Sequence, residues 1–375
     1  HATIRRQRQM CIRDSLLSML SRYNKLVVIS SHASFAYKEK SKSFKEIGKE
    51  LGVRYVIHGS VRKLGPRMRI NANLVSTENE KSIWSNNFDL KVEEVFDVQD
   101  KIAEEMVSTI VGRVEADALD SIKTKRPDNM DSYDLVLQGL EYAKKGNVMK
   151  ENTQKAVELF EKAIELEPSY ARAHAWRACT LSNLADWEES PDPKIFENAF
   201  KSIQLALELD SNEPEVHRIM GALKLWHERD HEMARYHFEK ARELCPSDVF
   251  IISRYAIMLI YFGEFDKALE ELERAKRLDP FSHDLLFGPE AICHFWMDNP
   301  IEALQTFKKV KVKKNFLFYI ALANEKSGNN DKASENLKEA YALTGMDNDS
   351  FVGSQPFKDQ ELTSQLKSEL SNITV

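Results

Sequence analysis

The sequence lacks several features that would define its class at once. Its 375 residues include only 13 glycines and 11 prolines, too few for a collagen-like or linker-dominated chain and low for a loop-rich β fold. No run of about 18 apolar residues occurs, so we expect no membrane-spanning helix within this sequence. The remaining composition, 42% hydrophobic and 30% charged, is typical of a globular protein with a sizeable core. At about 150 residues per domain, the length predicts two to three domains.

Cysteine and a large excess of one charge are also missing. The four cysteines lie far apart and form no C-x-x-C pair, which argues against a disulfide framework or a zinc knuckle and favours isolated thiols. They are Cys11, Cys179, Cys245 and Cys293. The 53 basic and 59 acidic residues give a net charge of −6, so we expect no nucleic-acid partner for this chain.

One basic run departs from this acidic balance. It consists of Lys308, Lys309, Lys311, Lys313 and Lys314. A run of this kind either lies in a solvated loop between helices or contacts an acidic partner, and the solvated loop is the simpler interpretation.

Residues 1–13 carry four arginines without an apolar period. No hydrophobic stretch follows them, so they are not a secretory signal. We interpret them as a non-native or disordered leader and exclude them from the fold. The natural N-terminus is then expected to be missing, which would make the chain a fragment of a longer protein.

Residues 14–122 show a mixed pattern that predicts a small α+β domain, a mixed sheet with helices. Within 67–75, Met68, Ile70, Ala72 and Leu74 alternate with polar residues, as in a half-buried antiparallel strand. The helix predicted at 43–51 begins with a Ser-x-x-Glu capping box and ends before a glycine. The expected strands are 25–30, 54–62, 67–75 and 82–88, and the other expected helix is 92–119.

From residue 132 onward the sequence repeats a helical pattern, after a polar linker at 123–131. An alanine is followed by a large apolar residue four positions later, by a small residue three further on, and often by a proline. Successive copies begin 43, 35, 34, 35 and 30 residues apart. The residues of this pattern, with the small residue of the first helix where it is clearest, are Gly139, Ala156, Phe160, Ala163, Pro168, Ala199, Ile203, Ala206, Ala234, Phe238, Ala241, Pro246, Ala268, Leu272, Ala275, Pro280, Ala303, Phe307, Val310, Ala333, Leu337 and Ala340.

A period of about 34 residues with this pattern resembles the tetratricopeptide repeat, TPR. Small residues let two antiparallel helices approach closely, and the large residue fills the gap to the next repeat. Proline ends the second helix because it lacks an amide hydrogen. The resemblance implies an all-α solenoid, a right-handed superhelix of about six repeats over 132–345, with a capping helix and tail at 346–375. The last repeats have the poorest spacing, so we expect the C-terminal third to be the first part to open.

The N-terminal region is similar to a bacterial TolB-N-like α/β domain. The similarity lies in residues 34–38, 51–56, 59–62, 67–74, Trp84 and 95–100. In that family the domain commonly precedes TPR arrays, either in the C-terminal half of class III adenylate or guanylate cyclases or behind winged-helix transcription regulators. The resemblance therefore implies an architecture more strongly than an activity.

Motifs that would indicate catalysis are absent or misplaced. Residues 227–231 match the zinc motif HExxH, but the repeat pattern places them across a helix–turn–helix corner, where the two histidines cannot share one helical face. No GxxxxGK[ST], GxGxxG or GxSxG sequence occurs. We therefore expect no catalytic residue, cofactor or metal in this chain, while the activity of the full-length parent stays open.

The concave face of a TPR array is formed by its first helices, and eight residues are expected to line it. These are Arg172, Ser182, Ile219, Trp226, Phe250, Ser253, Phe318 and Glu325. Together they would form a rather apolar groove that takes a partner helix or a docked segment. The alternative is an error of register that has placed core residues in this set.

The sequence thus favours a non-catalytic module that binds another protein or an upstream domain of the same chain. The alternative is the regulatory C-terminal part of a class III nucleotide cyclase, or of a winged-helix regulator, with the catalytic or DNA-binding domain missing. We expect a cytoplasmic location, or a periplasmic one if a membrane-spanning segment precedes this chain.

Overall fold

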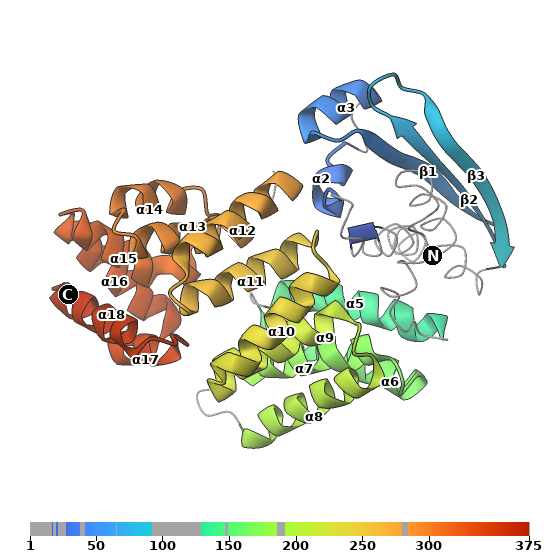
Figure 1. The fold of residues 1–375 in the computed structure, drawn as a ribbon. Helices are drawn as coiled ribbons and strands as arrows, with labels where there is room; N and C mark the ends of the chain where they lie inside the picture. Colours follow the sequence, from blue (N-terminus) through green and yellow to red (C-terminus); the bar gives the residue numbers. More distant parts are fainter. Residues whose placement is uncertain are drawn as a thin grey trace. The chain divides into compact units, whose positions relative to one another are not determined.

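The computed structural model consists of a small antiparallel sheet followed by a long series of helices (Figure 1). It describes residues 17, 20–21, 28–37, 42–64, 66–91, 129–146, 149–185, 192–279 and 284–374. The chain divides into two compact units, residues 1–216 with 244–247 and residues 217–243 with 248–375. The expected leader 1–13 and the expected helix 92–119 lie outside the described residues.

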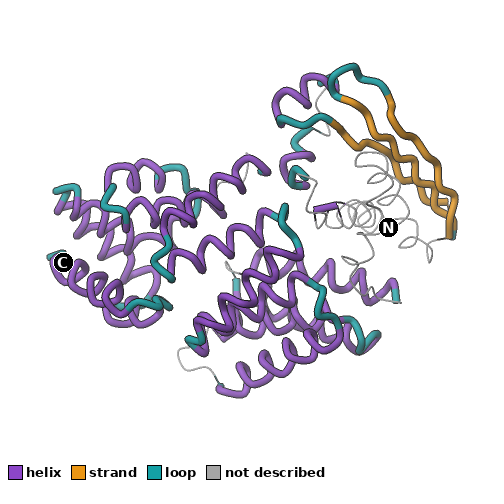
Figure 2. The backbone as a smooth tube through the Cα atoms, viewed as in Figure 1, coloured by secondary structure: helices purple, strands orange, loops and turns teal. Residues whose placement is uncertain are grey.

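The sheet contains three strands in the order β1 (Tyr55–Leu64), β2 (Arg67–Ser76) and β3 (Ser82–Lys91), all antiparallel (Figure 2). Tyr55 pairs with Ser76 at one end of β1, and Arg67 pairs with Lys91 across β2 and β3. The predicted alternation in β2 is confirmed. The four residues on its buried face are Met68, Ile70, Ala72 and Leu74, each at most 6% exposed.

The strand expected at 25–30 is wrong in its described part. Val28 and Ile29 are not in a strand, and Ser30 instead caps helix α2 (Ser31–Phe35), because its side chain accepts a hydrogen bond from the Ala33 amide. A serine cap after a short apolar run thus outweighs the β-branched residues of that run. The sheet is therefore purely antiparallel in the described residues, and not mixed as predicted.

Helix α3 (Phe44–Leu51) begins and ends as predicted. Ser43 and Glu46 form the complete capping box, and Gly52 closes the helix with φ 66°. The helix lies close to the end of β2, because a Cβ at Gly48 would stand 2.3 Å from the Thr77 side chain. The Thr77 hydroxyl donates to the Val53 carbonyl at 2.7 Å, which ties the strand end to the turn after the helix.

From Met130 onward, the described residues are almost entirely helical. Successive helices pack as pairs, α5 with α6, α7 with α8, α11 with α12, α13 with α14 and α15 with α16. The first pairs and their neighbour are α5 (Met130–Gly146), α6 (Lys150–Leu166), α7 (Ala171–Ala185), α8 (Pro193–Leu209) and α9 (Pro214–Leu223). The others are α10 (His231–Leu244), α11 (Val249–Tyr261), α12 (Phe265–Leu278), α13 (Asp284–Trp296), α14 (Pro300–Phe307), α15 (Leu317–Lys326), α16 (Asn330–Thr344), α17 (Asn348–Ser354) and α18 (Gln360–Asn372).

The alanines and large apolar residues of the repeat pattern are buried in every copy, none more than 3% exposed. Two glycines show how closely the paired helices approach. A Cβ at Gly139 would stand 2.6 Å from the Phe160 ring, and one at Gly221 would stand 3.0 Å from the Phe238 ring. Pro168 is exposed just after α6, where it ends the helix, and Pro280 lies outside the described residues.

A five-residue π-helix, Lys224–Glu228, joins α9 to the turn before α10. A π turn holds one more residue than an α turn, so it accommodates a 35-residue spacing where the pattern calls for about 34.

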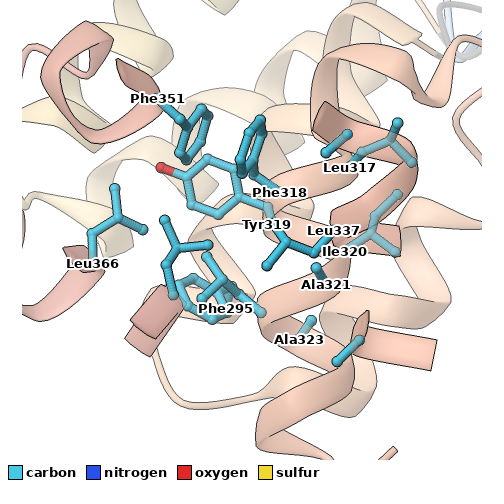
Figure 3. Close-up of a cluster of buried hydrophobic side chains, with 14 of the residues drawn as sticks. Phe295, Leu317, Phe318, Tyr319, Ile320, Ala321, Ala323, Leu337, Phe351 and Leu366 are labelled. Atoms are coloured by element: carbon cyan, nitrogen blue, oxygen red, sulfur yellow. The ribbon is translucent and has the colours of Figure 1, made fainter. Parts of the chain in front are cut away.

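The C-terminal end departs furthest from the repeat pattern. Helix α14 has only eight residues, so Val310 lies beyond its end, although it is 3% exposed. A short 3-10 helix, Lys313–Phe316, leads into α15. Where one capping helix was expected, two short helices follow α16, and α17 was not predicted. Phe351 of α17 stacks on Phe318 of α15 with ring centroids 4.0 Å apart (Figure 3).

Candidate protein-binding surface

The HExxH sequence forms a helix corner and not a metal site. His227 and Glu228 end the π-helix, Arg229 has the left-handed φ of 56°, and His231 begins α10. The two histidines therefore do not share a helical face, as predicted. Across the described residues, no group of three or more histidine, cysteine, aspartate or glutamate side chains could hold a metal ion.

This corner instead binds a stretch of main chain near the C-terminus. Arg229 donates through Nη2 to the carbonyl oxygens of Gly353 at 2.7 Å and Ser354 at 3.2 Å. His231 Nε2 lies 3.1 Å from the Pro356 carbonyl oxygen, which can only accept, so this nitrogen donates. We call residues 353–358 the docked segment.

The next turn of the array, after α11, holds the other half of the docked segment. The Lys358 amide donates to the Tyr261 carbonyl at 2.9 Å, and the Tyr261 hydroxyl donates to Gln355 Oε1 at 3.1 Å. The Lys358 ammonium pairs with Glu232 at 2.8 Å and lies 5.2 Å from the centre of the Phe262 ring. Main-chain and side-chain groups of the segment are therefore both bound.

An aromatic pocket takes the most buried side chain of the docked segment. Phe357 is 3% exposed and meets Tyr261 and Trp296 edge-on, with centroids 5.2 and 5.3 Å away. Trp226 lies edge-on to the other side of Tyr261 at 5.6 Å. Burial raises the pKa of Tyr261 to about 12, so its hydroxyl stays a hydrogen-bond donor at neutral pH.

Two features of Arg229 are energetically unfavourable in this arrangement. Its left-handed backbone is unusual for a residue with a side chain, and its buried Nη1 has no hydrogen-bond partner within the part of the chain that the structure describes. Desolvation lowers the pKa of its guanidinium. A strained residue whose side chain binds another segment is more typical of a binding site than of a plain turn.

Several residues expected to line a groove are in fact buried. Ile219, Ser253 and Phe318 are at most 3% exposed, and Ser182 is 9% exposed. The Ser253 hydroxyl donates to the Leu285 carbonyl of α13, and the Phe351 ring of α17 stacks on the Phe318 ring. The burial of all four residues agrees with the alternative that an error of register has placed core residues in this set.

The other four expected groove residues are half-buried: Arg172, Trp226, Phe250 and Glu325. Two guanidinium groups lie close to the Phe250 ring, those of Arg218 at 4.9 Å and Arg254 at 4.8 Å from its centre. Each contributes cation–π attraction to the ring. Of these four residues, only Trp226 belongs to the aromatic cluster that meets the docked segment.

Arg172 lies elsewhere, in the first compact unit. Burial alone would lower the pKa of its guanidinium, but the carboxylates of Glu213 and Glu215 outweigh that effect and raise it. The half-buried charge of Arg172 is therefore stabilised by these two carboxylates. The five lysines of the basic run are all exposed, and Lys309 lies 5.1 Å from the centre of the Phe287 ring.

The sequence analysis does not predict the docked segment or the residues that bind it. Of the expected groove residues, Trp226 packs on Tyr261, which is one of the residues that bind the segment. The available signal is Pro356-Phe357, an apolar pair within a polar tail. No periodic pattern links Pro356 to His231, 125 positions earlier, which donates to its carbonyl.

Two family models match parts of the chain. Residues 159–190 match a tetratricopeptide repeat, and residues 3–105 match the second domain of HilA/YgeH-like transcriptional regulators. A TPR unit is thus found within the helical part, at residues 159–190. The model that matches the N-terminal part differs from the TolB-N-like domain that the sequence resembles.

A Rhizobium meliloti (strain 1021) protein named "Putative adenylate cyclase 3" is 27% identical over 219 residues, which are 58% of this chain and 37% of that protein. The chain thus spans well under half the length of this relative. Among solved structures, PilF of Pseudomonas aeruginosa is 19% identical with a TM-score of 0.41, covering 63% of this chain and 97% of its own. A Parabacteroides merdae TPR protein is 15% identical with a TM-score of 0.42, covering 75% and 95%. Within the described residues, no helix is long and apolar enough to cross a membrane.

Proposed function

We propose that this chain is a non-catalytic protein-binding module, a TPR scaffold preceded by an α/β domain at about 14–122. One observation carries the proposal. The turns of two successive repeats hold the end of helix α17 and the non-helical stretch after it through main-chain carbonyl and amide groups. An array that binds peptide in this way within its own chain has the chemistry to bind a segment of another protein. The partner is another protein or an upstream domain of the same chain.

A photo-crosslinking experiment in the cells that make the protein tests this proposal. A photoreactive phenylalanine analogue replaces half-buried Phe250 at the start of a first helix, and in a matched strain it replaces exposed Glu243 on a second helix. We expect a discrete protein adduct from position 250 that is missing from position 243. Identical adduct patterns at both positions would refute the proposed binding face.

The alternative is that the chain is the regulatory part of a nucleotide cyclase, or of a transcription regulator. The Rhizobium meliloti relative supports the first form, and the match of residues 3–105 to a regulator domain supports the second. The in-frame coding sequence upstream separates them, since it would encode a cyclase domain or a winged-helix domain. The purified chain, proposed to be cytoplasmic, is expected to form no cyclic nucleotide from ATP with manganese. Measurable turnover would overturn its non-catalytic role.

A further inference from the structure

We infer that a partner can displace the docked segment from the surface that binds it. We also infer that this partner presents a non-helical proline–aromatic–basic stretch to that surface. This inference rests on the proposed protein-binding function and specifies the partner's chemistry. The surface consists of Arg229, His231, Glu232, Tyr261, Phe262 and Trp296, all within the second compact unit.

The main-chain contacts suit any segment with the same backbone course, the end of a helix followed by a non-helical stretch. Arg229 and His231 donate to three carbonyl oxygens, and the Tyr261 carbonyl accepts one amide hydrogen. Such contacts supply affinity without selecting a side chain, as in other modes of peptide recognition that use the backbone. A partner segment could therefore form the same main-chain hydrogen bonds as the chain's own segment.

The side-chain contacts define which segment fits. The pocket between Tyr261 and Trp296 takes an aromatic ring, because edge-on packing matches the charge distribution of aromatic rings. Glu232 and the Phe262 face favour a cation at the next position and oppose a carboxylate there. Proline fits just before the aromatic residue, since Pro356 is buried and only its carbonyl is bound.

The closed arrangement favours exchange because it leaves two buried polar atoms unsatisfied. Among the described residues, Arg229 Nη1 near the start of the segment and Glu369 Oε2 in the following helix have no hydrogen-bond partner. Each such group weakens the closed state, since its lost hydration is not replaced. A partner that supplies an acceptor to Arg229 would bind more favourably than the chain's own segment.

A competition experiment with the full chain tests the inference. The probe is a fluorescent peptide with the sequence of residues 351–374, titrated into the wild-type chain and into Phe357→Ala. The substitution removes the aromatic anchor from the chain's own segment only. We expect the peptide to bind Phe357→Ala about tenfold more tightly than wild type, or better. A peptide that itself carries Phe357→Ala should bind neither chain.

A milder variant covers the case in which Phe357→Ala fails to fold, which far-UV circular dichroism would show. Lys358→Glu in the chain places two carboxylates together at an exposed site, so the native peptide should bind about two- to fivefold more tightly. The double variant Glu232→Lys/Lys358→Glu restores an ion pair within the chain, and peptide affinity should fall back to the wild-type level or below.

Equal peptide affinity for wild type and for the folded variants would overturn the inference, as would no binding to any of them. That failure is distinct from failure of the proposed function, because crosslinking at position 250 reports a partner whether or not the docked segment exchanges. Peptide binding without any crosslinked partner would support the segment chemistry and refute the binding role in cells.

Discussion

The most regular repeat, α11 with α12, and the least regular one, α15 with α16, differ in a way the repeat pattern does not predict. Helix α11, the first helix of the repeat with a 34-residue spacing, buries eight of its thirteen residues. Helix α15 belongs to a 30-residue spacing, yet it buries eight of its ten residues, 317–324. The difference arises because α17 and α18 pack against the C-terminal repeat and contribute Phe351, Leu366 and Leu370 to its core.

Regular spacing therefore describes how two helices pair, whereas burial depends on what covers the pair. In a repeat array each unit is stabilised by its neighbours, and the end unit lacks one neighbour. Here the C-terminal helices replace that missing neighbour. We now expect α15 to be among the best-protected helices, contrary to the expectation that the C-terminal third opens first.

The largest effect is expected from Phe351→Ala, which removes the ring stacked on Phe318. Deleting a buried phenyl ring costs about 3–5 kcal/mol. Hydrogen exchange followed by mass spectrometry should show α15 losing protection, while α12 keeps it. The control is Leu269→Ala in α12, a half-buried residue, where a loss of about 1–2 kcal/mol should stay local. Equal loss of protection in α12 and α15 after Phe351→Ala would contradict this account of the C-terminal core.

Acid should destabilise the repeat formed by α9 and α10 through a buried histidine pair. His217 and His237 face each other with Nδ1 atoms 3.0 Å apart, beside the Tyr236 ring, with Lys224 and Asp230 nearby. Burial, then His217, lowers the pKa of His237 to about 4. The unfolded chain takes up this proton near pH 6.5, so stability should fall by roughly 2–3 kcal/mol as the pH drops from about 6.5 to 4.

Urea unfolding at a series of pH values measures this effect. His237→Gln should be less stable at pH 7 but should lose part of the dependence on acid, because it no longer titrates. Tyr236 is exposed, and Tyr236→Phe keeps both imidazoles, so this variant should retain the full dependence of stability on acid. An unchanged pH profile in His237→Gln would show that other groups cause the acid sensitivity.

Overpacking the regular repeat should have an intermediate effect. Ala268 is fully buried at the contact of α12 with α11, so Ala268→Leu should cost about 1–3 kcal/mol. Glu270→Leu, two positions away on the exposed face, should change stability by no more than about 0.5 kcal/mol. If thermal unfolding shows both variants to be equal, the helices at this contact have more room than the structure indicates.

The smallest effects come from two glycines of the C-terminal region that both face open space. Gly353 lies in α17, and a Cβ there would meet no atom within 4 Å, so Gly353→Ala should stabilise by about 0.5 kcal/mol. Gly345 is equally open but has φ 71°, so Gly345→Ala should destabilise by about 1 kcal/mol. Urea midpoints of the two variants should therefore move in opposite directions, and a shift of the same sign in both would be inconsistent with these backbone conformations.

Much of the fold could be predicted because its signals are local or periodic. The capping box at Ser43, the alternation in β2 and the alanine pattern each depend on residues within one element or one repeat. The docked segment could not be predicted, because Phe357 meets Tyr261 and Trp296 at separations that follow no period. The groove residues failed for a related reason. Periodicity places Ser253 and Phe318 on first helices, but it does not show what packs over them.

The π-helix at Lys224–Glu228 has a consequence for how this repeat tolerates changes in length. Deleting one residue there would restore the usual period of about 34 and allow an ordinary α-helix. If all five residues instead formed an ordinary α-helix without the deletion, every following residue would turn by about 100° around the helix axis, and Arg229 would move away from the carbonyls of Gly353 and Ser354. The π-helix thus lets the repeat keep one extra residue while Arg229 stays directed at the docked segment.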